Sequence, residues 1–211
     1  MPTDTFFRLA EEKRARIIDC AWEEFTLVAY SDVSINRIIQ KARIPRGSFY
    51  QYFEDKSDLF FFLMDQSRTQ FIELFRDELK RAGGDLFDLM LGVYDALFQG
   101  SGEVAPPFRR IFELFRLNVS MDVPRMFFER PREELEPLER LADGVDMTRL
   151  KRADKEYLTE VFTLLTSAVG CTIARTLQMP EQHEQERRHL LGQIEIIKNG
   201  SAAVPEGGHS K

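Results

Sequence analysis

Arg46 and Gln51 lie close together in a segment, residues 34 to 56, that is rich in hydroxyl, amide and basic side chains. An arginine can donate two hydrogen bonds to guanine, and a glutamine can pair in the same way with adenine, in the major groove of DNA. The two side chains are therefore candidates for contacts with base edges. The segment also carries five basic residues against two acidic ones: Arg37, Lys41, Arg43, Arg46 and Lys56 against Glu54 and Asp55. Because local cations supply affinity for phosphate, we predict that it binds double-stranded DNA.

A short helix is expected to begin this segment. Ser34 can accept a hydrogen bond from the free N–H groups of a helix start. Apolar residues follow at the spacing of one helical face: Ile35, Ile38, Ile39 and Ala42. Pro45 excludes the residue before it from the helical region, so this helix must end by about Arg43.

A second helix is expected to start at Pro45 or Arg46, because proline suits a first helical turn. Phe49 and Phe53 lie one turn apart and can pack against the first helix. The opposite side then remains polar and free to enter a groove. The pair of helices predicts a helix-turn-helix that reads DNA.

The same residues carry a family resemblance. Ser34, the apolar spacing after it, and the run Gly47-Ser48-Phe49-Tyr50-Gln51-Tyr52-Phe53 followed by Lys56 resemble the amino-terminal signature of the tetracycline-repressor (TetR) family of bacterial regulators. Residues 16 to 25 resemble the first helix of that family, and the match covers roughly residues 14 to 60. The turn departs from the pattern, because Arg43 stands where the family usually has glycine. Either Arg43 takes a left-handed backbone or Pro45 rearranges the turn.

The resemblance implies an organisation and a set of contacts. The fold would be all-α, with a three-helix DNA-binding domain (residues 1–55) and a helical effector-binding and dimerisation domain (residues 56–199). The protein would be a repressor that binds a palindromic operator as a homodimer and leaves it when a small molecule binds. Side chains at matching positions would hold phosphates: Ser34, Asn36, Ser48, Tyr50, Tyr52 and Lys56. Gly47 belongs to the same motif.

The remaining pattern is helical throughout, without the alternation typical of strands. Helices are expected at about residues 9–27, 56–81, 86–98, 153–178 and 181–198, with Asp85 as a cap and glycines 83, 84, 100 and 102 as stops. Pro106 and Pro107 are expected to open another helix, with Phe108, Ile111, Phe112 and Phe115 facing inward. Prolines break residues 121–144 into two short pieces. The tail, residues 200–211, has little to bury and is expected to be disordered.

Aromatic and methionine side chains are concentrated between residues 85 and 130, which favours an adaptable interior able to hold an apolar or aromatic effector. Any single phenylalanine there is more often plain core. Arg116 and Asn118 are more often surface or capping groups. The candidates are Phe87, Met90, Tyr94, Phe112, Phe115, Arg116 and Phe127.

The last two helices carry wide apolar faces, and the resemblance implies that they form a four-helix dimer interface. The candidates are Phe162, Leu165, Val169, Ile173, Leu190, Ile194 and Ile197. Small residues on the first of these helices, such as Ser167, Gly170 and Cys171, would let a partner helix approach closely.

Composition narrows the class further. The net charge of −6 arises entirely after residue 57, since residues 1 to 57 hold nine basic and nine acidic residues. No apolar run approaches the length of a membrane span, and we expect a cytoplasmic protein. Both cysteines are expected to be buried and reduced. His183 and His189 fall in a charged helix that we expect to be exposed, and no catalytic, cofactor or metal motif is present. The alternative to a regulator is a helical small-molecule-binding or interaction protein with weakened DNA affinity, which Arg43 and Pro45 would favour.

Overall fold

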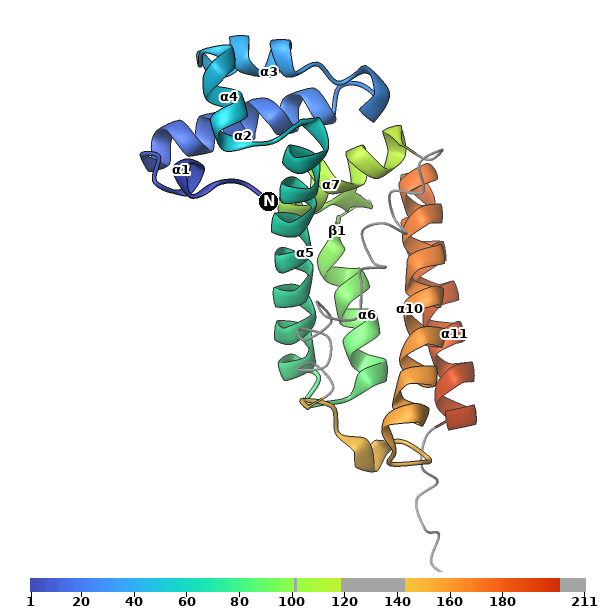
Figure 1. Ribbon diagram of the computed structural model, residues 1–211. Coiled ribbons are helices and arrows are strands. Elements are labelled where there is room, and N and C mark those ends of the chain that lie inside the picture. Colours follow the sequence, from blue (N-terminus) through green and yellow to red (C-terminus); the bar gives the residue numbers. More distant parts are fainter. Residues whose placement is uncertain (101, 119–142, 202–211) are drawn as a thin grey trace, which may run out of the picture. The chain divides into compact units, whose positions relative to one another are not determined.

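The computed structural model describes residues 1–100, 102–118 and 143–201 (Figure 1). Within these ranges the chain is helical apart from one small hairpin, which confirms the all-α prediction. The described residues form two compact units. Unit 1 holds Met1–Phe71 and the segment that begins at Pro106, and unit 2 holds Ile72–Ala105 and residues 143–201. The predicted short helices within 121–144 and the tail from residue 202 lie outside the described residues.

Unit 1 contains the predicted helix-turn-helix. Its elements are α1 (Asp4–Phe7), α2 (Glu11–Phe25), the 3₁₀ turn η1 (Tyr30–Asp32), α3 (Ile35–Ala42), α4 (Arg46–Tyr52), the first part of α5 (Lys56–Arg81) and α7 (Pro106–Leu117). Both ends of α5 fall where the sequence predicts them, and α7 begins at the predicted prolines. Helix α3 packs against α2, and α4 packs against both α1 and α3.

An aromatic cluster fixes α4 within unit 1. Phe49 and Phe53 are fully buried, as their one-turn spacing predicts. Phe6, from the unpredicted helix α1, is also fully buried and lies 4.8 Å from the ring of Phe53. Thr3 adds two hydrogen bonds at the end of α4, because its hydroxyl donates to the Gln51 carbonyl (2.6 Å) and its N–H to the Tyr52 carbonyl (3.0 Å). The segment that contains α1 therefore holds the last turn of the second helix.

The turn between α3 and α4 contains a left-handed residue at Arg43. Arg43 follows the end of α3 in the left-handed region, with φ 53° and ψ 48°. The N–H of Ile44 donates to the Ile39 carbonyl at 3.1 Å, and the N–H of Arg43 to the Gln40 carbonyl at 3.2 Å. These bonds close the helix in the manner usually served by glycine. Of the two alternatives, Arg43 adopts the left-handed backbone, and α4 begins at Arg46 behind Pro45 as predicted.

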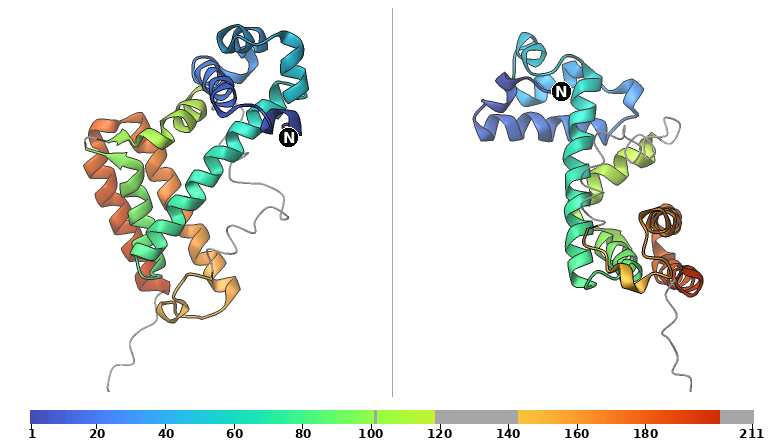
Figure 2. Two further views of the ribbon diagram at one scale, coloured as in Figure 1. Left: turned by 90° about the vertical axis from the view of Figure 1, so that its left-hand side faces the viewer. Right: turned by 60° about the horizontal axis from the view of Figure 1, so that its bottom comes forward.

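Unit 2 is a bundle around α6. Its elements are the rest of α5, α6 (Leu86–Leu97), strands β1 (Phe98–Gln99) and β2 (Glu103–Val104), the 3₁₀ turn η4 (Met147–Arg149), α10 (Lys155–Gln178), the 3₁₀ turn η5 (Pro180–Gln182) and α11 (His183–Ser201). Helices α6, α10 and α11 lie side by side (Figure 2). The predicted cap is confirmed, because the carboxylate of Asp85 accepts the N–H groups of Phe87 (2.8 Å) and Asp88 (3.1 Å).

The antiparallel hairpin formed by β1 and β2 was not predicted. Gly100 and Gly102 were expected only to end a helix. Both have positive φ, and they turn the chain back so that β2 pairs with β1. Two-residue strands are too short for alternation to show in a sequence.

Arg43→Gly is expected to stabilise the protein. A left-handed backbone destabilises a residue with a Cβ by roughly 1 to 2 kcal/mol, and glycine avoids this strain. Part of the gain is offset because glycine gives the unfolded chain more conformational entropy. We expect the free energy of unfolding to rise by about 0.5 to 1 kcal/mol, measured by urea denaturation. Arg43→Ala removes the same charge but keeps the Cβ, and it should bring no such gain. If both variants changed the free energy of unfolding equally, the backbone of Arg43 would not be strained.

Candidate DNA-binding interface

The structure brings most of the predicted DNA-contacting residues onto one exposed surface formed by the start of α3 and by α4. Asn36, Arg46, Gly47, Tyr50 and Gln51 are exposed, and Ser48 is half-buried. A guanidinium nitrogen of Arg46 lies 3.4 Å from the amide oxygen of Asn36, so the two helices share a polar contact at this surface. No atom lies within 4 Å of a Cβ built on Gly47, and the backbone there is open to close approach.

Two of the predicted phosphate contacts have other partners. Tyr52 is only 4% exposed, and its ring lies 6.1 Å from that of Phe6. The ammonium of Lys56 donates to the carbonyl oxygens of Tyr30 (2.8 Å) and Val33 (3.4 Å) and lies 4.6 Å above the Tyr30 ring. Contact of Tyr52 and Lys56 with phosphate stays a prediction, and it would require both side chains to leave these positions.

Ser34 caps α3 as predicted, accepting a hydrogen bond from the N–H of Arg37 at 3.4 Å. Its own N–H donates to Glu24 of α2 at 3.0 Å. The same carboxylate oxygen accepts from two guanidinium nitrogens of Arg37, at 2.7 and 2.6 Å. Glu24 is completely buried, so this one side chain ties the start of α3 to α2.

The hydrogen bonds to Glu24 also determine its ionisation. Burial alone would raise the pKa of this carboxyl, but the Arg37 side chain and the Ser34 N–H outweigh burial and hold the pKa below its ordinary value. The carboxylate is therefore charged at neutral pH. Nothing in the sequence distinguishes Glu24 from its exposed neighbour Glu23, except that Glu24 falls on the apolar face of α2 beside Phe25 and Ala21.

Helix α7 contacts the loop that precedes α3. Asn118, just beyond α7, is 2% exposed, and its amide oxygen accepts the N–H of Tyr30 at 2.7 Å. Its amide nitrogen donates to the Leu114 carbonyl at 2.8 Å. Arg110 of α7 forms an ion pair with Asp19 of α2 at 2.9 Å. Helix α7 is thus joined both to α2 and to the loop before α3.

Comparison with known proteins agrees with this geometry. Residues 17–62 match the family described as "Bacterial regulatory proteins, tetR family". These residues run from within α2 through α3 and α4 to the start of α5. The DNA-binding part of the chain, residues 17–62, is therefore similar to the TetR family. The matched residues are those that form the exposed surface, the Glu24 contacts and the turn at Arg43.

Curated relatives match part of this chain. Transcriptional regulator AcuR of Cereibacter sphaeroides is 38% identical over 58 residues, which cover 28% of this chain and 26% of the relative. HTH-type transcriptional regulator SAB2452 of Staphylococcus aureus is 36% identical over 67 residues, 32% of this chain and 36% of the relative. The chain thus aligns with only about a quarter to a third of the length of these two relatives.

Solved structures extend the likeness to the whole chain. A TetR family transcriptional regulator from Chloroflexus aurantiacus is 25% identical, with a TM-score of 0.54, over 97% of this chain and 100% of that one. A TetR family transcription regulator from Marinobacter aquaeolei has a TM-score of 0.59 over 92% of this chain and 97% of its own, and at 19% identity it supports the fold alone.

The predicted effector residues are divided between the two units. Phe87, Met90 and Tyr94 lie in α6 and are buried in unit 2, where the hydroxyl of Tyr94 is hydrogen-bonded to that of Thr176 at 2.7 Å. Helix α7 of unit 1 carries buried Phe112 and Phe115 and exposed Arg116, which pairs with Glu113. Phe127 lies outside the described residues. The buried members pack as core side chains within their own units.

The predicted dimer residues also face inward in part. Leu165, Val169, Leu190 and Ile194 are buried in unit 2, whereas Phe162, Ile173 and Ile197 are half-buried. The outer side of α10 and α11 exposes a different apolar set: Leu164, Leu191, Ile196 and Cys171. Cys171 was expected to be buried, and that prediction was wrong, whereas Cys20 is buried as expected.

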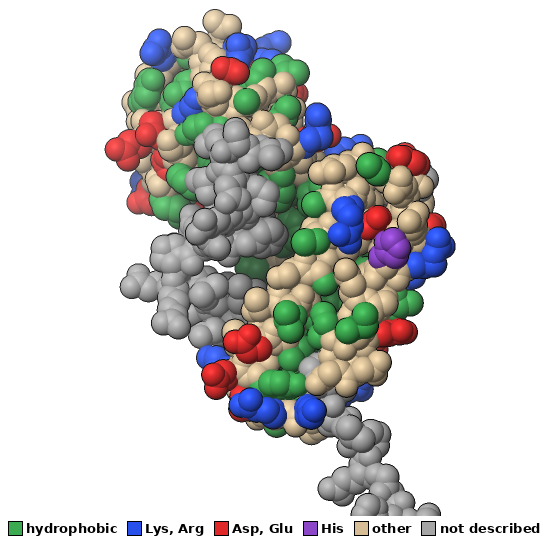
Figure 3. Space-filling view, turned by 90° about the vertical axis from the view of Figure 1, so that its right-hand side faces the viewer, with side chains coloured by type: hydrophobic (Ala, Val, Ile, Leu, Met, Phe, Trp, Pro, Cys, Tyr) green, Lys and Arg blue, Asp and Glu red, His purple; other side chains and the backbone are tan. Residues whose placement is uncertain are grey.

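Helix α10 is long and apolar enough to cross a membrane by length and composition, yet only 28% of its most apolar stretch is buried. A single helix of this kind is weak evidence for a membrane span. Figure 3 looks onto the side that carries α10 and α11, where hydrophobic side chains and uncharged surface lie between the charged side chains.

His183 corrects another expectation, because it is buried rather than exposed. Its ring stacks on that of Tyr94 at 5.7 Å and lies 5.9 Å from that of Phe98. The unpredicted hairpin covers it, since a Cβ at Gly102 would lie 2.8 Å from the His183 Cβ. The aromatic surroundings of His183 do not suit a metal ligand. His189 is six residues further along α11, so the two side chains do not lie on one face of the helix.

Glu24→Gln is expected to lower the free energy of unfolding by about 2 kcal/mol at neutral pH, because the charged hydrogen bonds to Arg37 are lost. The depressed pKa of Glu24 also sets a pH dependence. The charged carboxylate of Glu24 stabilises the fold fully at a pH above 4.5, the ordinary glutamate pKa. This stabilisation is lost as the pH falls through the lower pKa of the folded protein, so Glu24→Gln should lose less stability in acid than the unmodified protein does. Denaturation curves at pH 3 to 7 would test this. Glu23→Gln, at the exposed neighbour, should change stability by less than about 0.5 kcal/mol.

Proposed function

We propose that the protein is a DNA-binding transcriptional regulator that represses its target genes, binds a palindromic operator as a homodimer and dissociates when a small molecule binds. The observation that supports this most directly is the exposed polar surface of α4, held in a helix-turn-helix that is similar to the TetR family. The named relatives are regulators, and none of their names describes an enzyme.

In this proposal α4 enters the major groove. Arg46 and Gln51 are exposed on its outer side and would contact base edges, where arginine prefers guanine and glutamine prefers adenine. Ser34, Asn36, Ser48 and Tyr50 would contact phosphates and set the register. The contact between Asn36 and Arg46 favours this arrangement, because it restricts the arginine before DNA binds.

The homodimer would be formed through the outer side of α10 and α11. A helix as apolar as α10 that buries so little of its surface needs a partner, and small residues on its outer side (Ser167, Gly170, Cys171 and Ala174, all exposed) allow another helix to come close. Two helix-turn-helix units related by a two-fold axis can then read the two halves of a palindrome.

Effector binding would change the position of α5 or α7, the helices that contact the loop before α3. An apolar or aromatic effector among the aromatic side chains of α6 or α7 would have to open a packed interior. That fits a switch between two discrete packings rather than a rigid preformed site. Release of DNA would follow if one of these packings holds the two α4 helices at the wrong separation.

Selection of binding sites from random duplex DNA with the purified protein tests the function. Recovery of a palindrome, with affinity that falls as salt rises, would support a dimeric DNA-binding regulator. Absence of any enriched sequence at two salt concentrations would instead favour a helical small-molecule-binding or interaction protein with weakened DNA affinity.

Arg46→Ala is expected to weaken binding to the selected site by about 1 to 3 kcal/mol and to relax the preference at one base pair of each half-site. The measurement is a fluorescence anisotropy titration with the selected site and with each single-base variant. Arg76→Ala removes an exposed arginine from the unit 2 part of α5 and should leave both quantities unchanged. A uniform loss on all sequences would show that Arg46 holds a phosphate.

Leu164→Glu is expected to dissociate the dimer, because Leu164 is 57% exposed on α10 and a charge there would be buried by a partner. Sedimentation equilibrium at micromolar concentration should give twice 24.6 kDa for the unmodified protein and 24.6 kDa for the variant. Leu27→Glu is the control, since Leu27 is 65% exposed but lies in unit 1. A mass near 24.6 kDa for the unmodified protein would exclude the homodimer.

A further inference from the structure

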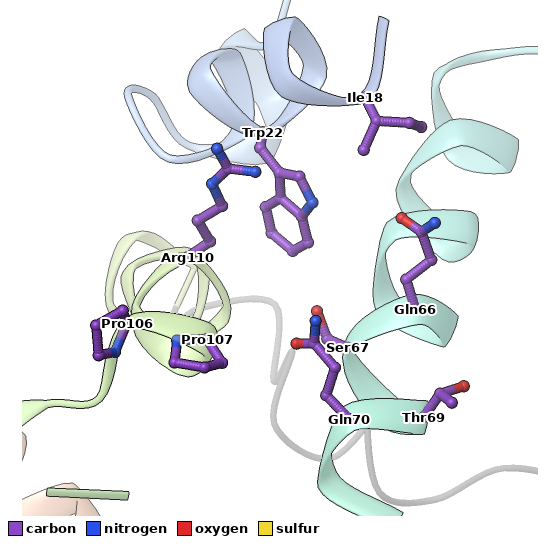
Figure 4. Close-up of a pocket in the computed structure, with 9 residues that line it drawn as sticks. All are labelled: Ile18, Trp22, Gln66, Ser67, Thr69, Gln70, Pro106, Pro107 and Arg110. Carbon is purple, nitrogen blue, oxygen red and sulfur yellow. The ribbon is translucent and has the colours of Figure 1, made fainter. Parts of the chain in front are cut away.

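Unit 1 contains an open groove with a volume of about 560 Å³, between α2, α5 and α7 (Figure 4). Cavities that hold drug-sized ligands have volumes of this order. None of the nine lining residues belongs to the effector set predicted from the sequence. The groove therefore needs its own explanation.

One wall of the groove is flat and apolar. The indole of Trp22 projects from α2 into the space, and Pro106 and Pro107 form the surface at the start of α7 (Figure 4). Trp22 is only 6% exposed, so its ring is held in place by the packing of unit 1. A rigid aromatic face beside proline rings suits the flat face of an aromatic ligand.

The facing wall belongs to α5 and carries hydrogen-bonding groups. Gln66 and Gln70 lie one turn apart on α5. The side chains of Ser67 and Gln70 point towards Trp22, and that of Gln66 points towards α2 (Figure 4). Ser67 is 5% exposed, which is low for a hydroxyl on a helix surface. Such a wall can bind polar groups on the edge of a ring.

The only cationic side chain among the lining residues is Arg110, on α7. One guanidinium nitrogen pairs with Asp19 at 2.9 Å. The two side chains are 50% and 57% exposed, so this ion pair is weak and can be exchanged. The guanidinium has further N–H donors, in the planar arrangement that matches a carboxylate.

We propose that this groove is a binding site for a planar aromatic carboxylate. The ring would lie between Trp22 and the prolines, and the carboxylate would take over Arg110 from Asp19. The amides of Gln66 and Gln70 would bind polar substituents on the ring.

The proposal goes beyond the proposed function, because it concerns a preformed site inside the DNA-binding unit and not the interior assigned to the effector. Its consequence for regulation rests on that function. A ligand between α2 and α7 would occupy the junction at which Arg110 and Asp19 join them.

The experiment uses the full-length protein without DNA, so its failure and the failure of DNA binding can be told apart. Trp22 is the only tryptophan of the chain, and its fluorescence reports directly on the groove. The probes are benzoate and biphenyl-4-carboxylate, each paired with its neutral carboxamide. We expect the carboxylates to quench Trp22 fluorescence saturably and to bind about tenfold more tightly than the amides, with calorimetry as a second measurement.

Three variants separate recognition from general effects of charge. Arg110→Gln should weaken binding of the carboxylates about tenfold and leave the amides unaffected. Arg109→Gln makes the same change of charge at the exposed neighbour, which does not line the groove, and should have no effect. Asp19→Asn removes the carboxylate that competes for Arg110, so it should tighten binding of the carboxylates several-fold. Thermal unfolding of each variant establishes that it is folded.

Three results would overturn the proposal. The first is carboxylates and amides binding alike or not at all up to millimolar concentration. The second is Arg110→Gln and Arg109→Gln having the same effect, which would indicate diffuse electrostatics. The third is weaker binding of the carboxylate probes to Asp19→Asn. That would mean that Asp19 orients Arg110 for the ligand instead of competing with the ligand for Arg110.

Discussion

The geometry of the DNA-binding helices depends on one buried negative charge. A carboxylate removed from water is strongly unfavourable unless it is paired and hydrogen-bonded, and Glu24 finds both kinds of partner only at the start of α3. Helix α3 therefore cannot separate from α2 without leaving Glu24 unpaired. Because the turn at Arg43 fixes how α4 follows α3, the direction of Arg46 depends on the same contact. Thr3 and Phe6 hold the other end of α4. The exposed surface is thus positioned by groups that lie behind it.

This construction uses up part of the positive charge that the sequence suggests is available for DNA. Of the five basic residues between 34 and 56, Arg37 pairs with the buried Glu24 and Lys56 binds backbone carbonyls. Lys41, Arg43 and Arg46 remain exposed. A surface with few uncommitted cations gains less from non-specific phosphate contact, so a larger share of its affinity must come from base contacts.

The features that the sequence predicted well are those set by local physics. The limits of α5, the cap at Asp85 and the start of α4 behind Pro45 all follow from spacing and backbone restriction within a few residues. The features that it missed depend on partners far along the chain. Glu24 resembles its exposed neighbour until α3 is placed beside it. His183 is buried because an unpredicted hairpin folds over it, and α1 is too short for any periodic signal. Likewise, the groove exists only once α7 lies against α2 and α5.

Tyr30 is the residue at which these distant contacts meet. Its N–H is bound by Asn118 at the end of α7, its carbonyl by the ammonium of Lys56 at the start of α5, and its hydroxyl by Ser57. The loop before α3 is thus hydrogen-bonded to both helices. A movement of either helix must break these bonds or displace the loop, and Ser34 a few residues later is fixed to Glu24. Energetic coupling needs an element with two discrete arrangements. The loop from Tyr30 to Ser34 is the element on which both helices act, since α5 and the end of α7 both hydrogen-bond to Tyr30.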